Sequence, residues 1–179
     1  VSAAKFRKAQ QAIVQVRPYA DRLNRMLKNI AANTDGGSNL VYNQEREVKK
    51  VLLVIVTSTR GLCGAFNTNV VKSAIATIDA KYSQVYKEGN LSVLCIGKKG
   101  FDGLRRRYPK ANFNVENMDL FLKLTFENVA LVSQEIMNQF ANKEYDEIVV
   151  AYSRFKNAAM QFAEVEQFLP IPKQEETTQ

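Results

Sequence analysis

The first part of the chain carries an apolar stripe at helical spacing. Its members recur at alternating intervals of three and four residues, which is the heptad pattern of a coiled-coil helix. They are Phe6, Ala9, Ile13, Val16, Ala20, Leu23, Leu27 and Ile30, and we call this set the seam. A seam of this length needs a partner helix, and the rest of the chain offers none of similar length. Pro18 falls opposite the seam, so we expect a bend within one continuous helix, with a break at Arg17 as the alternative.

The chain beyond residue 40 has the alternation of strands and helices that is typical of an α/β domain. Residues 51–56 and 91–96 are continuous apolar runs, as expected for strands that are buried on both faces. The helical pattern at 67–87 lies between them, which makes a βαβ unit and predicts a parallel strand pair. The remaining elements are predicted at 101–108 (helix), 112–116 (weak strand), 125–142 (helix), 146–152 (strand) and 160–169 (strand). The last two strands must be antiparallel because their connection is short.

Apolar spacing also predicts which side chains face the core. The helix at 67–87 should bury Val71, Ala74, Ile75, Ile78, Tyr82 and Val85, and the helix at 125–142 should bury Phe126, Val129, Ile136 and Phe140. In the last strand we expect Ala163, Val165 and Leu169 on one face, with Glu164 and Glu166 on the other. The result is a three-layer α/β domain with a mostly parallel sheet and one antiparallel edge strand.

Turn-forming residues divide the chain into segments. The sequence NTDGGSN at 33–39 contains no apolar residue and marks the end of the first helix. We therefore predict a shaft helix at 1–33, a linker at 34–47, the α/β domain at 48–172 and a polar tail at 173–179.

Positive charge is concentrated in the first helix. Residues 1–32 hold seven basic residues and one acidic residue, a net charge of +6, out of +7 for all 179 residues. This asymmetry favours an acidic partner, which could be protein, nucleic acid or lipid headgroups; the alternative is a solvated basic face. No apolar run approaches the roughly 18 residues of a membrane span.

The chain offers little for catalysis or metal binding. It contains no histidine, the commonest general base near neutral pH, and no CxxC spacing between its two cysteines, Cys63 and Cys95. We expect reduced thiols, no catalytic residue, no metal and no cofactor. A glycine group at Gly97, Gly100 and Gly103, with Lys98 and Lys99 between, either seats a phosphate or forms a solvated basic helix start.

The segment 57–69, TSTRGLCGAFNTN, joins the first strand to its crossover helix, where ligands usually bind in open α/β sheets. It lacks the Lys-Ser or Lys-Thr of a Walker loop and has no GxGxxG. Two hypotheses remain open. In the first, the glycines serve a tight turn only. In the second, the loop forms an interaction site whose candidate residues are Arg60, Gly61, Leu62, Cys63 and Gly64.

Several segments, taken together, resemble a known family. VSAAKFRKAQ with RPYADRL, then TSTRGLCGAFNTN, IGKKG and YSRFKNAAMQ leading to FLPIP are similar to successive landmarks of F-type ATP synthase gamma subunits, in the family's order. The resemblance implies a Rossmann-like domain and a central-stalk rotor. In that family the N-terminal helix pairs with a long C-terminal helix, so we expect this chain to be cut at both ends and to lack that partner helix.

The resemblance also implies partners and a location. Lys5, Arg7 and Lys8 would lie near the catalytic beta subunits, and 60–64 near the acidic lever loop of beta. Other expected partners are the alpha and epsilon subunits and the membrane c-ring, on the cytoplasmic side of a bacterial inner membrane. ATP would be made or hydrolysed on beta, with no active site and no cofactor on this chain. The unpaired helix could also self-associate in a non-native way.

Two other functions compete with the rotor hypothesis. One is a nucleic-acid-binding protein that uses the basic helix, although zipper proteins place their basic block before the heptads and this chain has its basic residues around them. The other is a nucleotide-dependent enzyme built on the α/β domain. We expect neither nucleic-acid binding nor ATP binding.

Overall fold

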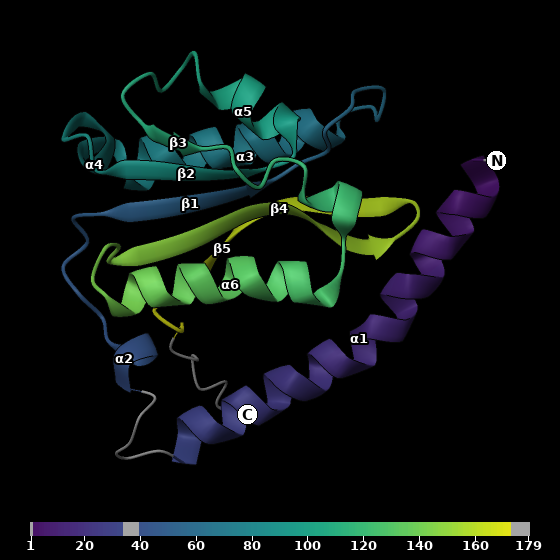
Figure 1. Ribbon diagram of the computed structural model, residues 1–179, viewed down its shortest axis with the longest axis horizontal. Coiled ribbons are helices and arrows are strands. Elements are labelled where there is room, and N and C mark those ends of the chain that lie inside the picture. Colours follow the sequence, from purple (N-terminus) through teal and green to yellow (C-terminus); the bar gives the residue numbers. More distant parts are fainter. Residues whose placement is uncertain (1, 34–39, 173–179) are drawn as a thin grey trace. The chain divides into compact units, whose positions relative to one another are not determined.

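The computed structural model describes residues 2–33 and 40–172, which form two compact units divided between Leu40 and Val41. The first unit is built on one helix, α1 (Ser2–Asn33), drawn in purple in Figure 1. α1 continues through Pro18 without a break, in agreement with one continuous helix.

The seam of α1 is open to solvent wherever its side chains are described. Residues at intervals of three and four share one face of an α-helix, so the seam forms a single stripe along α1. Its described side chains, Phe6, Ala9, Ile13, Val16 and Ala20, are all exposed. Those of Leu23, Leu27 and Ile30 lie outside the described residues. The pairing of this seam with a second helix remains a prediction.

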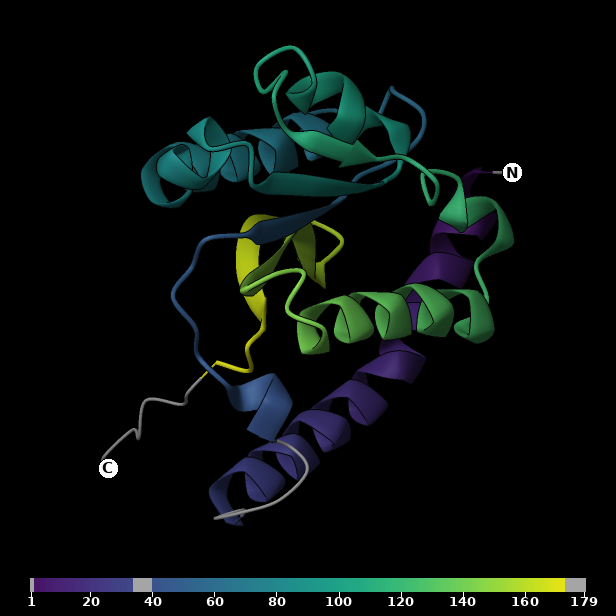
Figure 2. The same ribbon diagram turned by 60° about the vertical axis from the view of Figure 1, so that its left-hand side comes forward.

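The second unit contains a five-stranded sheet in the order β3-β2-β1-β4-β5 (Figure 2). The β1, β2 and β4 strands pair in parallel, β3 is parallel to β2, and β5 is antiparallel to β4. The predicted fold class, a mostly parallel sheet with one antiparallel edge strand, is confirmed. The strands are β1 (Val51–Val56), β2 (Leu91–Ile96), β3 (Asn112–Asn114), β4 (Glu147–Asn157) and β5 (Met160–Leu169).

Helices cover both faces of this sheet, which gives the three predicted layers (Figure 1). One face is packed by α3 (Phe66–Lys81), α4 (Ser83–Lys87) and α5 (Lys98–Leu104), around Leu53 and Ile55 of β1. The other is packed by α6 (Phe126–Ala141), around Leu52 and Val54. The apolar run of β1 is therefore continuous because its alternate side chains enter two different cores. The short elements α2 (Leu40–Asn43) and η1 (Leu120–Lys123) complete the unit.

The register of the central strands brings their carboxyl ends to one edge. Val51 lies opposite Leu91, and Val56 lies opposite Ile96, so β1 and β2 begin and end level with each other. Because α3 and α5 follow these two strands, the chain leaves β1 and β2 side by side at this edge. The segment 57–69 and the glycine group that begins at Gly97 are neighbours for this reason.

The structure corrects several element boundaries. The predicted helix 67–87 is broken at Tyr82, whose backbone (φ −121°, ψ 18°) is not helical. Tyr82, at the break, and Val85, in the short helix that follows it, are both buried as predicted. The helix predicted at 101–108 begins three residues earlier, at Lys98, and ends at Leu104.

Two predicted core assignments are wrong. Ile136 and Phe140 of α6 are buried as expected, together with Val132, but Phe126 and Val129 are exposed because they lie on the first turn of α6, before the part of the helix that packs on the sheet. On β5, Leu169 packs with the α6 core while Ala163 and Val165 pack on the opposite face. The register shift between Ile148 and Val149 explains the second error, because a bulge reverses the alternation of faces.

The segment before β1 is tied to the far end of α6. The Nη1 group of Arg46 donates to the backbone oxygens of Phe140 (2.9 Å) and Tyr145 (3.1 Å), and its guanidinium lies 4.3 Å from the centre of the Phe140 ring. Asp146 accepts from the backbone N–H groups of Lys49 and Lys50 at 3.0 and 2.9 Å. A side chain from the segment predicted as a linker thus bonds one carbonyl group in the last turn of α6, that of Phe140, and one in the connection to β4, that of Tyr145.

Candidate partner-binding loop

The carboxyl ends of β1 and β2 are joined by a buried hydrogen-bond joint centred on Thr57. Its N–H donates to Ile96 O at 2.9 Å, and its side-chain oxygen accepts from the N–H of Gly100 at 2.8 Å. The neighbouring Lys99 N–H donates to Ser58 O at 3.1 Å. Thr57 is 1% exposed, so water does not compete for these bonds. The start of the loop is therefore fixed to the start of α5.

Gly97 allows the close approach that this joint requires. Its backbone has φ 85° and ψ 145°, a conformation almost restricted to glycine. A Cβ at this position would collide with the carbonyl oxygen of Thr57 and lie 2.6 Å from the carbonyl carbon. Gly97, the first member of the glycine group, is therefore accounted for by its packing against Thr57, without a phosphate site.

Asn67 holds the loop closed from its other end. Its Oδ1 accepts from the Ser58 N–H at 2.9 Å, while its Nδ2 donates to Ser58 Oγ at 2.8 Å and to Cys63 Sγ at 3.0 Å. The backbone N–H of Phe66 also donates to Cys63 O at 3.3 Å. One amide side chain in the first turn of α3 thus links both sides of the loop.

The tip of this closed loop displays the apolar Leu62 and the basic Arg60, and the half-buried Lys99 of α5 lies beside it. Leu62 is fully exposed and has φ 62°, an uncommon conformation for a non-glycine residue. Arg60 is exposed, and the ammonium nitrogen of Lys99 lies 4.0 Å from the position that a Cβ on Gly61 would take. Fixed backbone, positive charge and an exposed leucine are features that suit contact with an acidic protein surface.

The other predicted contact residues lie on the first unit. Lys5, Arg7 and Lys8 are exposed on the first turns of α1. Among the predicted loop residues, Arg60, Gly61, Leu62, Cys63 and Gly64 all lie at the exposed surface of the second unit. Their assignment as partner-binding residues remains a prediction.

Sequence reasoning missed the residues that shape the loop. Thr57, Ser58 and Asn67 are ordinary polar residues of a loop in the sequence, and only the parallel pairing of β1 and β2 brings Thr57 to Gly100. A signal did exist for Gly97, since a glycine directly after a buried strand often marks a close backbone approach.

The two cysteines have different surroundings. Both are free, with Cys63 exposed and Cys95 buried in β2. Burial raises the pKa of the Cys95 thiol to about 12, so this group stays protonated near neutral pH. Cys95 therefore serves as a small core side chain.

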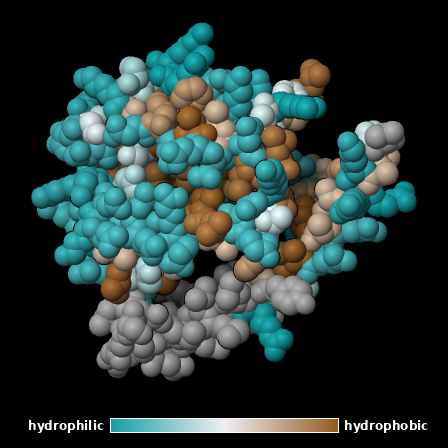
Figure 3. All heavy atoms as spheres, viewed as in Figure 1, coloured by the Kyte–Doolittle hydropathy of each residue, from teal (hydrophilic) through white to brown (hydrophobic). Residues whose placement is uncertain are grey.

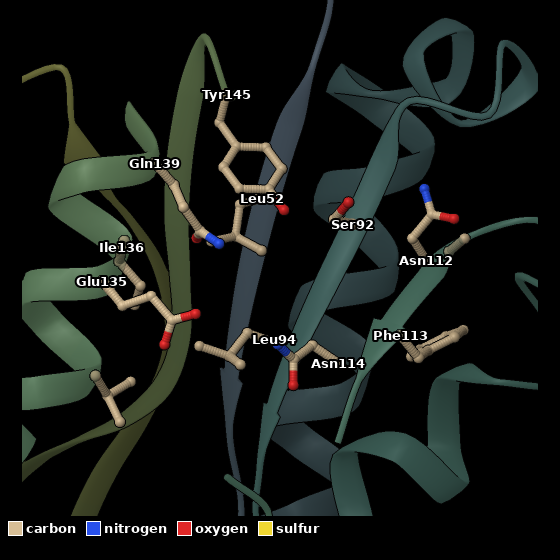
Figure 4. Close-up of a pocket in the computed structure, with 12 residues that line it drawn as sticks. Leu52, Ser92, Leu94, Asn112, Phe113, Asn114, Glu135, Ile136, Gln139 and Tyr145 are labelled. Carbon is tan, nitrogen blue, oxygen red and sulfur yellow. The ribbon is translucent and has the colours of Figure 1, made fainter. Parts of the chain in front are cut away.

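A cavity of about 440 Å³ lies on the α6 side of the sheet (Figure 4). Leu52 and Leu94 lie beneath it, and Glu135 and Gln139 extend toward it from α6 (Figure 4). Its side away from α6 is polar, with Ser92, Asn112 and Asn114 of β2 and β3.

Within residues 2–33 and 40–172, no group of three or more His, Cys, Asp or Glu side chains is placed to hold a metal ion. None of the helices described in these ranges combines the length and the apolar character needed to cross a bilayer.

Comparison with known proteins places the whole chain in one family. The family model described as "ATP synthase" matches residues 1–179. The ATP synthase gamma chain of Cytophaga hutchinsonii is 47% identical over 174 residues, covering 97% of this chain and 58% of the relative. That of Flavobacterium psychrophilum is 45% identical over 171 residues, covering 96% and 57%. The chain thus spans a little over half the length of these curated relatives.

A solved structure agrees on the fold. The central stalk and c-ring structure of the mitochondrial ATP synthase of Tetrahymena thermophila includes a chain that matches with a TM-score of 0.62 and 24% identity, covering 94% of this chain and 68% of that one. At this identity the match supports the fold alone. The family model and the curated relatives together show that the chain belongs to the gamma-chain family of ATP synthases.

Proposed function

We propose that this chain acts as the central-stalk rotor subunit of an F-type ATP synthase, where it couples rotation of the membrane ring to conformational cycling of the catalytic beta subunits. The observation that carries the proposal is the combination, in a member of the gamma family, of a 32-residue helix that exposes a basic-flanked apolar seam with an α/β unit. A long helix of this kind can form part of a shaft because an α-helix rises about 1.5 Å per residue, so its contact surface extends over many turns along one axis.

In this proposal the chain makes or hydrolyses no ATP itself. An off-axis shaft presents different surfaces to three equivalent beta subunits and biases each of them toward a different conformation by differential contact free energy. The basic residues of α1 and Arg60 attract acidic groups on beta, and Leu62 adds an apolar contact. Alpha, epsilon and the c-ring complete the set of proposed partners, on the cytoplasmic side of a bacterial inner membrane.

Co-purification tests the assembly. The chain is co-expressed with the alpha subunit and a tagged beta subunit from the same organism, and the expected result is a complex that contains this chain. Ile13→Asp, which interrupts the seam and leaves every basic residue in place, serves as the control for capture by charge alone. The proposal fails if the chain does not co-purify, or if Ile13→Asp co-purifies as fully as the unchanged chain.

Charge spread over α1 and the loop predicts that no single cation is essential. Exposed ion pairs contribute about 0.2–1 kcal/mol and are screened within about 10 Å at 0.1 M salt. We therefore expect Arg60→Gln or Lys5→Gln to change the rate of ATP-driven rotation by at most about fivefold. Lys87→Gln, an exposed lysine of α4 at the opposite edge of the sheet, should leave the rate unchanged. Complete loss of rotation in either single variant would contradict a distributed contact.

A further inference from the structure

The second unit exposes a group of large apolar side chains where η1 leads into α6. We call Phe121, Leu122, Leu124, Phe126 and Val129 the 121–129 patch. Leu122 is 77% exposed and Phe126 is 85% exposed, far more than large apolar side chains usually are. Apolar side chains gather over this region in Figure 3. Contiguous exposed apolar surface of this kind is typical of an interaction site.

The backbone beneath the patch is fixed by local hydrogen bonds. Thr125 caps α6 by accepting from the N–H of Asn128 at 3.2 Å, and the Asn128 side chain donates to Lys123 O at 2.7 Å. Leu122 N–H donates to Asp119 O at 2.9 Å, and Leu120 packs against the α6 core. The patch side chains are therefore carried by η1, by the first turn of α6 and by the short connection between them, whose backbone these bonds hold in place.

Acidic residues border the patch. Between residues 116 and 131 the chain contains Glu116, Asp119 and Glu127 but only one basic residue, Lys123. All four are exposed, and none forms a salt bridge in the part of the chain that the structure describes. The local net charge of −2 opposes contact with anionic lipid headgroups and favours a basic partner.

We propose that the 121–129 patch docks an amphipathic helix of another protein, whose apolar stripe is flanked by Lys and Arg. Phe126 and Val129 lie about one turn apart on α6 and form the helical part of the patch, along which a partner helix can pack, while Phe121 and Leu122 are presented by η1. The flanking cations of that helix face Asp119 and Glu127. This contact goes beyond the proposed rotor function, which uses α1 and the loop at Leu62.

Two synthetic helical peptides test the proposal on the full chain. Both have leucine at the a and d positions of about three heptads, and the flanking positions are Lys in one peptide and Glu in the other. The Lys peptide should bind, and Leu122→Gln combined with Phe126→Gln should weaken its Kd at least about tenfold. Leu131→Gln, which removes an exposed leucine outside the patch, should leave Kd unchanged.

The informative quantity is the difference in peptide binding between the unchanged chain and the variant with Leu122→Gln and Phe126→Gln. The basic α1 offers the Glu peptide a separate site, so binding to the unchanged chain alone does not report on the patch. Asp119→Lys combined with Glu127→Lys should weaken the Lys peptide and strengthen the Glu peptide. The proposal is overturned if the patch variant binds the Lys peptide as the unchanged chain does, or if it loses both peptides equally.

Vesicles that contain phosphatidylglycerol should show no patch-dependent binding. If they do, the proposal is overturned and the patch binds a membrane surface. Peptide binding is independent of co-purification with alpha and beta, so the two proposals can fail separately.

Discussion

Gly97→Ala is expected to destabilise the second unit by about 3–5 kcal/mol, a size that single substitutions seldom reach. Alanine at φ 85° and ψ 145° already costs about 1–3 kcal/mol. The added Cβ would in addition collide with the carbonyl group of Thr57. This residue is buried and cannot shift without breaking the bond from its N–H to Ile96 O and the bond that its side chain accepts from Gly100. Denaturant unfolding followed by circular dichroism measures the change in the free energy of unfolding.

Gly89→Ala is the matched control for this substitution. Gly89 also has a positive φ, 78°, but a Cβ there meets no atom within 4 Å. Its expected cost is about 1–2 kcal/mol, which reflects the backbone conformation alone. If the two alanine variants were equally destabilised, the contact between Gly97 and Thr57 would have no energetic role.

We expect the Gly97 joint to matter for the proposed function because it supports the candidate loop. Loosening it would free the connection between Thr57, Ser58 and Lys99, whose hydrogen bonds fix the start of the loop. An exposed leucine contributes more to the free energy of binding when its backbone is already ordered, because the cost of ordering the loop is then not incurred on contact. The stability of this edge and the display of Leu62 are thus linked through the same few bonds.

Sequence reasoning located the elements wherever burial left an unmistakable pattern. The strands β1 and β2 were predicted with the same boundaries as the structure has, because a strand packed on both faces carries an uninterrupted apolar run. The antiparallel β5 followed from the short connection to β4. These features depend on local composition and chain length only.

Side-chain facing was harder to predict, because periodicity identifies a stripe without showing what covers it. Phe126 and Val129 fit the helical spacing of α6 as well as Ile136 does, yet only the later residues lie over the sheet. Leu169 changed face through a bulge that leaves no trace in the sequence. Both errors arise from tertiary arrangement.

The candidate loop was recognised by its position after a buried strand, but its internal order was not. The role of Asn67 depends on three hydrogen bonds to two residues, Ser58 and Cys63, which the turn of the chain brings to it across intervals of nine and four residues. No rule of spacing predicts such a set of bonds. The motif TSTRGLCGAFNTN is therefore easier to understand as one folded unit than as a series of separate contact residues.

Phe140→Ala is expected to lower the free energy of unfolding of the second unit by about 3–5 kcal/mol. Phe140 is fully buried in the core between α6 and the sheet, so its removal leaves a cavity as well as losing apolar burial. The Phe140 ring also makes a cation–π contact with the Arg46 guanidinium, 4.3 Å from the ring centre. The substitution removes this contact but leaves the hydrogen bonds from Arg46 to the backbone oxygens of residues 140 and 145. The same denaturant titration measures the effect.

Phe126→Ala makes the same chemical change at the other end of α6. Phe126 is 85% exposed, so its truncation removes almost no buried surface and should change the free energy of unfolding by less than about 0.5 kcal/mol. The comparison distinguishes a phenylalanine that stabilises the core, Phe140, from one that is exposed at the surface, Phe126. If Phe126→Ala were as destabilising as Phe140→Ala, the 121–129 patch would be part of the fold and not a surface kept open for a partner.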